Sequence, residues 1–414
     1  MEKIRAWLLG HPIWIAIGLS MGTALGASLT RFSYALFVPA MREDLNWSYL
    51  TAGSLNTAHA LGYLLGALTL SFVIQRFSVS YAFIVGGILT SIFIGLCAFV
   101  TDTSSIGGFR FLSGLTSASV FAGGTVLIAQ LASIHPTRSG LLLGIYYAGG
   151  GFGMIVSAFL VPAAINLGLV WQWEHHWQFG WLVVSIVGLV MTLCMWIPSI
   201  SVPQIVKRIL TSDSTNPRSY LAIGSGYFFF GMGYIGYMTF IISLLHSQGW
   251  NTLELSLFYT TIGIFGMSGA QLWSVALDKF KGGQCLALIN SLLAVSCFIP
   301  AYVALNYQNE QTVLTTFSIY ISGGIFGACL TSAVAATTAF VKHNMPQSQW
   351  VSAITIFTSI FAVGQVIGPS LTGWISDTSG ELPIGFVVSA LILFSGAVLS
   401  SLQKPLEDRG LINN

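Results

Sequence analysis

The feature that most constrains this chain is a series of long apolar segments, each of about twenty residues or more. A transmembrane helix needs about 20 mainly apolar residues, so each segment is long enough to cross a bilayer. Only 7% of the residues are charged, against roughly a quarter in soluble domains. The sequence therefore predicts an all-α integral membrane protein. Its twelve spans are expected at 13–40, 48–74, 80–100, 104–132, 140–164, 179–198, 219–246, 253–276, 284–304, 312–340, 350–373 and 382–402.

The basic residues outside the spans predict the orientation of the chain. With both termini in the cytoplasm, every loop and tail cation except Arg42 falls on the cytoplasmic side. The two remaining cations, Arg31 and Arg110, lie inside predicted spans. We therefore expect a multi-pass protein of a bacterial inner membrane. The cytoplasmic cations are Lys3, Arg5, Arg76, Arg138, Lys207, Arg208, Arg218, Lys279, Lys281, Lys342, Lys404 and Arg409.

An internal repeat predicts the domain organisation. The polar stretch 200–218 is expected to be a cytoplasmic linker between two six-helix bundles, 1–199 and 219–414. Such a parallel repeat is typical of transporters that bind substrate between two bundles. The four-residue glycine spacing of the fifth span returns in the eleventh and permits close helix approach. At an offset of 203 residues the halves align Arg31 with Tyr234, Tyr34 with Tyr237, Phe37 with Phe240, Trp47 with Trp250, Gly66 with Gly269, and Arg76 with Lys279, while Gly149 and Gly153 correspond more loosely to Gly364 and Gly368.

Several short motifs together resemble the major facilitator superfamily. The basic loops after the second and eighth spans read Gln75-Arg76-Phe77 and Asp278-Lys279-Phe280, and the fourth span opens with Arg110-Phe-Leu-Ser-Gly114. More narrowly, Arg31-Phe-Ser-Tyr34 and Gly233-Tyr-Ile-Gly-Tyr237 resemble the bacterial YbfB/YjiJ-type branch.

The resemblance covers essentially the whole chain. It implies a secondary active transporter whose first, fourth, seventh and tenth helices line a central path. It also suggests a cytoplasmic gate, with Arg76, Asp278 and Lys279 as candidates. The loop after the second span lacks the superfamily's usual acidic residue, so that gate is expected in the second half, where Asp278 is present.

The two intramembrane arginines are the main candidates for substrate binding. A charge in a transmembrane helix is costly and marks a functional site by default. No Asp or Glu lies in the central part of any predicted span, so neither Arg31 nor Arg110 has an obvious counter-ion. Guanidinium groups bind carboxylate or phosphate through paired hydrogen bonds, which favours an anionic ligand. Alternatively, helix carbonyls could satisfy either arginine, either could snorkel to the headgroups, and Arg110 could serve packing or a proton path.

Polar residues at helical spacing complete the candidate site. Tyr34 lies one turn beyond Arg31 on the same helix face, and tyrosines can donate to an anion while stacking on its skeleton. His59, near the middle of the second span, is the candidate proton carrier because its reference pKa is near 6.5; a permanently neutral, hydrogen-bonded histidine is the alternative. The further predicted substrate-binding residues are Tyr234, Tyr237, Asn56 and Gln365.

The stretch from Trp171 to Gln178, WQWEHHWQ, is interpreted as an interfacial anchor and not as a metal site. Adjacent histidines do not share a helical face, and the four tryptophans of this region are typical of a membrane interface: Trp171, Trp173, Trp177 and Trp181. The five cysteines show no metal or disulfide spacing. We therefore expect no metal and no cofactor.

These patterns predict a symporter of a small organic anion, a carboxylate or even a polycarboxylate metal chelator, working by alternating access and coupled to protons. The proton could be taken up by His59 or carried on the substrate, and exchange and uniport are the alternatives to proton coupling. A drug-type exporter with an aromatic cavity is an alternative, and a receptor or sensor that does not transport is another. No enzyme motif is found, and the scattered cations give no nucleic-acid signal. The expected partners are the anion, the lipid bilayer and protons, and the protein is expected to be a monomer.

Overall fold

The computed structural model describes residues 7–203, 216–307 and 311–406, and within these ranges every regular element is a helix. Much of the predicted linker 200–218 lies outside the described residues, as do Lys3, Arg5, Lys207, Arg208 and Arg409. In chain order the elements are α2 (Pro12–Thr23), the π-helix η1 (Ala24–Phe32), α3 (Tyr34–Leu45), α4 (Tyr49–Phe77), α5 (Val79–Leu96), η2 (Cys97–Phe99), α6 (Thr103–Ile134), η3 (Pro136–Arg138), α7 (Ser139–Val170), α8 (His176–Ser201), η4 (Pro217–Tyr220), α9 (Leu221–Ser247), α10 (Thr252–Lys279), α11 (Gln284–Asn306), α12 (Val313–Leu330), α13 (Ser332–Asn344), η5 (Gln347–Gln349), α14 (Trp350–Ser379) and α15 (Leu382–Ser401).

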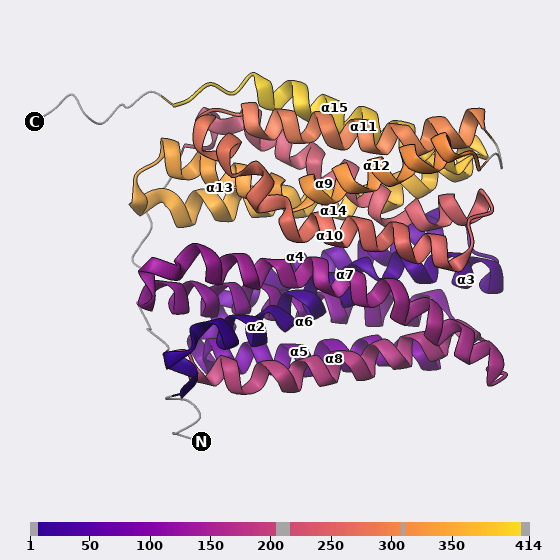
Figure 1. Ribbon diagram of the computed structural model, residues 1–414, viewed down its shortest axis with the longest axis horizontal. Coiled ribbons are helices and arrows are strands. Elements are labelled where there is room, and N and C mark those ends of the chain that lie inside the picture. Colours follow the sequence, from indigo (N-terminus) through magenta and orange to yellow (C-terminus); the bar gives the residue numbers. More distant parts are fainter. Residues whose placement is uncertain (1–6, 204–215, 308–310, 407–414) are drawn as a thin grey trace, which may run out of the picture. The chain divides into compact units, whose positions relative to one another are not determined.

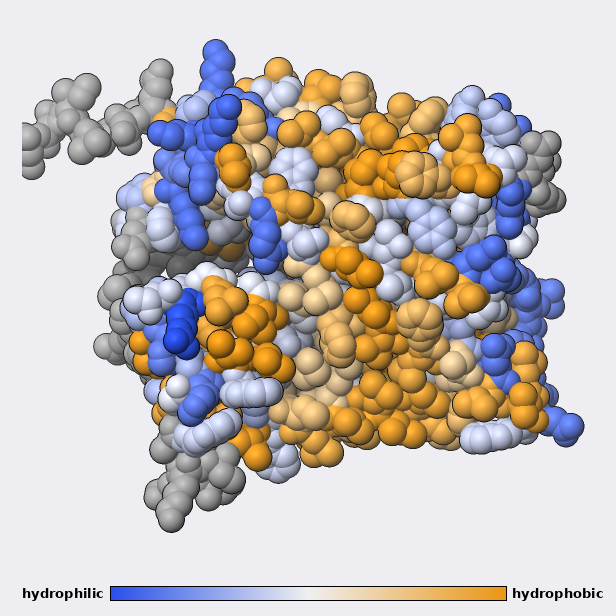
Figure 2. Space-filling model, in the orientation of Figure 1, coloured by the Kyte–Doolittle hydropathy of each residue, from blue (hydrophilic) through white to orange (hydrophobic). Residues whose placement is uncertain are grey.

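The helices confirm the predicted membrane class. Among the described residues, eleven helical segments are long and apolar enough to cross a membrane. The remaining predicted span, 253–276, lies within α10, a helix of 28 residues. On the face shown in Figure 2, hydrophobic residues cover the middle of the helices and hydrophilic residues gather at their ends. This is the pattern that a bilayer with aqueous phases on both sides requires.

The chain divides into two compact units. The first contains residues 1–206 together with 238–267, and the second contains 207–237 together with 268–414. These units differ from the predicted bundles at 238–267, because the second part of α9 and the first part of α10 group with the first unit. The division into bundles of six helices each remains a prediction. Figure 1 shows the helices within each unit running lengthwise beside one another.

The first span departs from the continuous helix that its hydropathy suggests. Between α2 and α3 the backbone winds into η1, where the Ser33 N–H bonds the Ser28 carbonyl at 2.8 Å, five residues back. The Thr30 hydroxyl likewise donates to the Leu25 carbonyl at 2.6 Å. π-Helical segments are rare and often occur at functional sites. Arg31 lies in the last turn of this segment.

Glycines bring α4 and α6 into backbone contact. A Cβ atom added to Gly62 of α4 would lie 2.0 Å from the Phe111 carbonyl oxygen, and one added to Gly114 of α6 would lie 2.1 Å from the His59 carbonyl oxygen. Only glycine permits such an approach at these two positions. The contact places the polar residues of α4 against those of α6.

The predicted glycine pairs are confirmed as close-approach positions. A Cβ atom at Gly149 of α7 would lie 2.2 Å from the Ser20 carbonyl oxygen of α2. In the second unit, a Cβ atom at Gly364 of α14 would lie 2.3 Å from the Phe228 carbonyl oxygen of α9. The fifth span thus packs on the first as the eleventh packs on the seventh, which supports the internal repeat.

Candidate functional site

Arg31 of η1 and Arg110 of α6 are the two buried cations among the described residues. Every Asp and Glu in the described ranges is at least partly exposed, and neither arginine takes part in an ion pair there. The two charges are close enough to act on one another electrostatically. The first unit therefore holds two positive charges without a negative partner from the described part of the chain.

Arg110 is held by neutral hydrogen-bond acceptors and by aromatic rings. Its Nη1 donates to the Thr30 carbonyl at 2.6 Å and its Nη2 to Asn56 Oδ1 at 3.1 Å. The guanidinium carbon lies 4.5 Å from the ring centre of Tyr34 and 5.7 Å from that of Trp181. Cation–π contacts of this kind stabilise a desolvated guanidinium. Arg110 thus ties α6 to η1 and α4, and only its Nε lacks a hydrogen-bond partner among the described residues.

Two other predicted ligands are also engaged by the protein itself. The Asn56 Nδ2 donates to the Thr239 hydroxyl at 2.7 Å, on the part of α9 that belongs to the first unit. The Tyr34 hydroxyl donates to the Ala52 carbonyl at 2.9 Å. Asn56 and Tyr34 therefore position Arg110, and their predicted contact with substrate remains a prediction.

Arg31 is surrounded differently. Its side chain is buried, with 7% of the residue exposed, and its Nε and Nη2 have no hydrogen-bond partner among the described residues. The guanidinium carbon lies 6.0 Å from the Phe32 ring centre, a distant cation–π contact. Nε and Nη2 form one edge of the guanidinium plane. This edge is the fork that binds a carboxylate side-on through two parallel hydrogen bonds.

His59 of α4 is fully buried beside these cations. Its Nδ1 lies 3.3 Å from the Ser113 hydroxyl, which in turn lies 2.8 Å from the Arg110 carbonyl. Its Nε2 has no hydrogen-bond partner among the described residues. The charges of Arg31 and Arg110 both act on the imidazole.

The carbonyls that end η1 also find distant partners. Arg110 donates to Thr30, and the Tyr259 hydroxyl of α10 donates to the Phe32 carbonyl at 2.7 Å. A change from π- to α-helical winding disturbs the regular backbone ladder. Side chains from other helices therefore stabilise the winding that carries Arg31.

The remaining predicted ligands lie in the second unit. Gln365 of α14 donates to the Tyr234 hydroxyl of α9. The Tyr234 ring stacks on Phe230, with ring centres 4.8 Å apart. The Tyr237 ring stacks on Phe326 at 4.1 Å. These residues belong to two sets of stacked rings in the second unit, and their predicted contact with the substrate remains a prediction.

The candidate gate residues lie at helix ends. Arg76 ends α4, and Asp278 and Lys279 end α10; all three are exposed. The ion pairs found among the described residues lie elsewhere, at Asp44 with His175 and at Glu43 with His246. The cytoplasmic gate therefore remains a prediction.

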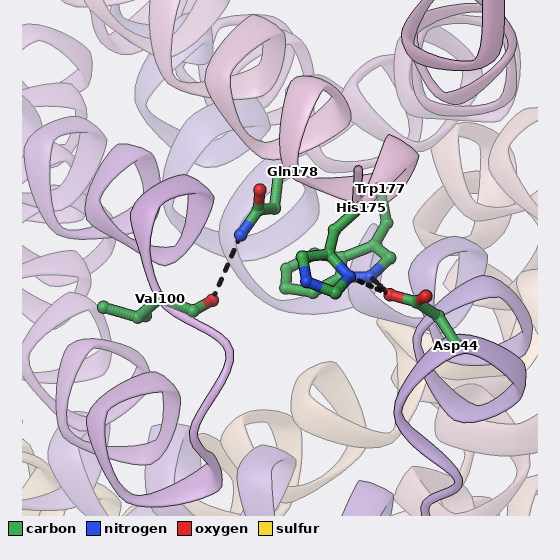
Figure 3. Close-up of polar contacts among 5 residues, drawn as sticks. All are labelled: Asp44, Val100, His175, Trp177 and Gln178. Atoms are coloured by element: carbon green, nitrogen blue, oxygen red, sulfur yellow. Dashed lines mark hydrogen bonds and ion pairs between the residues drawn. The ribbon is translucent and has the colours of Figure 1, made fainter. Parts of the chain in front are cut away.

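The anchor interpretation of the stretch that follows Val170 is wrong in part. Trp171 is exposed, but Trp177 is fully buried. Figure 3 shows His175 and Trp177 pointing at the end of α3, where His175 Nδ1 and Trp177 Nε1 each lie 2.6 Å from Asp44 Oδ2. The same view shows Gln178 reaching the Val100 carbonyl at 3.5 Å. A hydrogen bond to the half-buried carboxylate of Asp44, and not the lipid interface, holds Trp177.

Two residues of the site escaped the sequence analysis. Ser113 lies three residues after Arg110 on the same helix face, so helical spacing could have identified it. Trp181, assigned to the interface, is fully buried and stacks on Phe37 at 3.9 Å. No pattern in the sequence indicates that Trp181 lies beside Arg110.

Comparison with known proteins matches this chain to membrane transporters. The chain matches the family described as "Uncharacterised MFS-type transporter YbfB" over residues 21–401. A "Putative tartrate transporter" of Agrobacterium vitis is 23% identical, covering 93% of this chain and 92% of its own. A "Hexuronate transporter" of Bacillus subtilis (strain 168) is 20% identical, covering 91% of this chain and 92% of its own.

A solved structure shows the same fold. It is that of a bacterial homologue of the human lysosomal transporter Spinster, in an inward-facing and occupied conformation. The TM-score is 0.72 at 15% sequence identity, and the match covers 95% of this chain and 97% of that chain. The expected fold class is therefore confirmed.

Proposed function

The chain belongs to the YbfB-type family of major facilitator transporters, and from this premise we propose that it carries a small organic anion, a carboxylate, across the membrane by alternating access. The resemblance inferred from the motifs is confirmed, and the protein is a transporter and not an enzyme. We place it in a bacterial inner membrane, in line with the distribution of its cations.

The observation that carries this proposal is the free edge of Arg31. A buried guanidinium without a counter-ion is costly in a membrane, and the Nε and Nη2 of Arg31 have no partner among the described residues. A carboxylate would supply both the missing charge and two acceptors. Arg110 already bonds Thr30 and Asn56, so we assign it to positioning and assign Arg31 to the anion.

Two relatives support an anionic substrate. The names of both, a putative tartrate transporter and a hexuronate transporter, refer to carboxylates. Each alignment covers more than nine-tenths of this chain. Because the identities are only 23% and 20%, these relatives support the chemical class of the substrate and not a particular compound.

We further propose that the anion moves together with a proton. Moving one negative charge inward against a membrane potential of 100 mV costs about 2.3 kcal/mol, and a proton that moves with it cancels this work. No buried carboxylate is available for a relay among the described residues, and two guanidinium charges act on His59. We therefore assign the proton to none of the described residues, and the carboxylate that binds Arg31 stays ionised.

A thermal-shift screen of purified protein tests the assignment of Arg31. The ligands are tartrate, succinate, lactate, propionate, gallate and benzoate, applied to the wild type, Arg31→Ala and Arg31→Lys. Arg138→Ala removes an exposed arginine and serves as the matched control. We expect one or more acids to stabilise the wild type and the control but not Arg31→Ala, and Arg31→Lys to bind at least about tenfold more weakly because an ammonium cannot form the fork.

An acid that binds Arg31→Ala as tightly as it binds the wild type contradicts the proposal. Uptake into liposomes then separates the other classes. Equal transport of neutral or cationic compounds, unaffected by Arg31→Ala, favours the drug-type exporter. Binding without any movement across the membrane favours a receptor.

A further inference from the structure

We propose that the transported acid carries a hydroxyl group near its carboxylate and that the Nε2 of His59 accepts a hydrogen bond from that hydroxyl. This inference rests on the proposed function, in which Arg31 binds the carboxylate. It makes His59 the residue that distinguishes a hydroxy acid from the corresponding acid without the hydroxyl.

The hydrogen bonds around Ser113 determine which nitrogen of His59 carries the proton. The Ser113 hydroxyl has one proton, and that proton is donated to the Arg110 carbonyl 2.8 Å away. The same oxygen must therefore act as acceptor toward His59 Nδ1, at 3.3 Å. Neutral His59 thus carries its proton on Nδ1, and Nε2 presents a lone pair.

A neutral His59 suits its position beside two buried cations. Both Arg31 and Arg110 act on it electrostatically, and a third positive charge in the same buried region is unfavourable. The buried Nε2 has no donor among the described residues. A ligand group that donates a hydrogen bond is what this position lacks.

The polar network connects His59 to the Arg31 site. Arg110 bonds the Thr30 carbonyl, next to Arg31 in the chain, and its own carbonyl accepts from Ser113. Asn56, one turn before His59 on α4, bonds the same guanidinium. The free donors of Arg31 and the free acceptor of His59 are therefore two complementary groups of one cluster in the first unit.

The chemistry of these two groups selects a substrate class. The ionised carboxylate of a simple acid offers only acceptors, so it can satisfy Arg31 but leaves Nε2 without a partner. A buried polar atom left without its partner is penalised, and sites built for a hydroxyl reject analogues that lack it. A hydroxy acid satisfies both groups. We expect the wild type to prefer it by about tenfold to a hundredfold.

Matched acid pairs test this inference on the full-length purified protein. Tartrate and succinate share a carbon chain and differ in hydroxyls next to the carboxylates, as do lactate and propionate. The readout is the ratio of the two Kd values within each pair, for the wild type, His59→Phe, His59→Gln and Ser113→Ala. A ratio cancels any general loss of affinity from altered packing.

We expect His59→Phe, which keeps the ring but has no acceptor, to bring the ratio close to one. His59→Gln retains an acceptor oxygen and should keep part of the preference. Ser113→Ala removes the acceptor that fixes the tautomer, so the ratio should fall to an intermediate value. Phe and Gln variants that lower both affinities alike, with an unchanged ratio, would show a purely structural role and overturn the inference.

The outcomes also separate this inference from the proposed function. If the wild type binds both members of a pair equally and Arg31→Ala binds neither, the anion site stands and the hydroxyl contact is wrong. If no acid of any pair binds the wild type, both are wrong.

Discussion

Arg31 and Arg110 carry the same charge in the same unit, yet their surroundings differ. Arg110 has two hydrogen-bond acceptors and two aromatic rings around it. Arg31 keeps one whole edge of its guanidinium without a partner from the described residues. The difference shows that a buried charge can have either of two roles. Arg110 holds helices together, and we propose that Arg31 is left for a ligand.

The largest expected effect is on stability in Arg110→Met. The substitution leaves the Thr30 carbonyl and the Asn56 amide oxygen without their donor, and each buried acceptor left unsatisfied costs about 1–3 kcal/mol. We expect a large fall in the unfolding temperature in detergent, measured by intrinsic fluorescence. An unchanged unfolding temperature would remove the distinction between the two arginines.

Arg31→Met should have the opposite effect on the protein without ligand. It removes a charge whose place in a transmembrane helix costs roughly 2.5–3.5 kcal/mol on insertion scales. We expect the unfolding temperature to stay the same or rise, while stabilisation by an added acid disappears. A fall as large as that of Arg110→Met would mean that Arg31 is also structural.

A substitution at the contact between α4 and α6, the helices that carry Asn56 and Arg110, is expected to have a smaller effect on stability. Gly114→Ala places a Cβ atom 2.1 Å from the His59 carbonyl oxygen, so the helices must separate. We expect destabilisation of about 1–3 kcal/mol, in the range of other overpacked sites. Gly108→Ala on the same helix is the control, because a Cβ atom there meets nothing within 4 Å; it should be neutral or slightly stabilising.

The smallest effect concerns Asp102, the exposed N-cap of the helix that carries Arg110. The Ser105 N–H donates to its carboxylate at 2.8 Å and lowers the pKa of Asp102 below its ordinary value of 3.8. Because the pKa of Asp102 is lower in the folded protein than in the unfolded chain, this carboxylate stabilises the fold at pH values above its ordinary pKa. The stabilisation is lost as the pH falls through the pKa of the folded state.

Asp102→Ala should therefore lower the unfolding temperature slightly at pH 7 and less at pH 3. Acid binding at pH 7 should not change, since Asp102 lies outside the Arg31 site. An altered acid Kd in Asp102→Ala at pH 7 would show that any loosening of α6 disturbs the site, and the Arg110 result would then lose its specific meaning.

The sequence analysis recovered the parts of this protein that depend on local composition. The apolar lengths predicted the spans, the motifs predicted the family, and the glycine spacing at Gly149 and Gly364 predicted close helix packing. Hydropathy and small-residue spacing are properties of single segments, so they can be read without knowing how the helices meet.

The same analysis did not foresee contacts with partners on other helices. Tyr34 and Asn56 were predicted to bind substrate; they bond Ala52 and Arg110, and their contact with substrate remains a prediction. Trp177 was assigned to the interface and instead reaches Asp44. Such partners come from other helices, and helical spacing gives only the face on which a residue lies.

By itself, the sequence determined that a polytopic helical transporter carries two intramembrane arginines and no acid in the centre of any span. Only the tertiary structure decided which arginine is satisfied. Arg31 lies in the last turn of the π-helix η1, and the meeting of α4, α6 and η1 gives Arg110 two acceptors. Hydrogen-bond partnership is a property of the packed helices, because it depends on atoms that are distant in sequence and brought together only by folding.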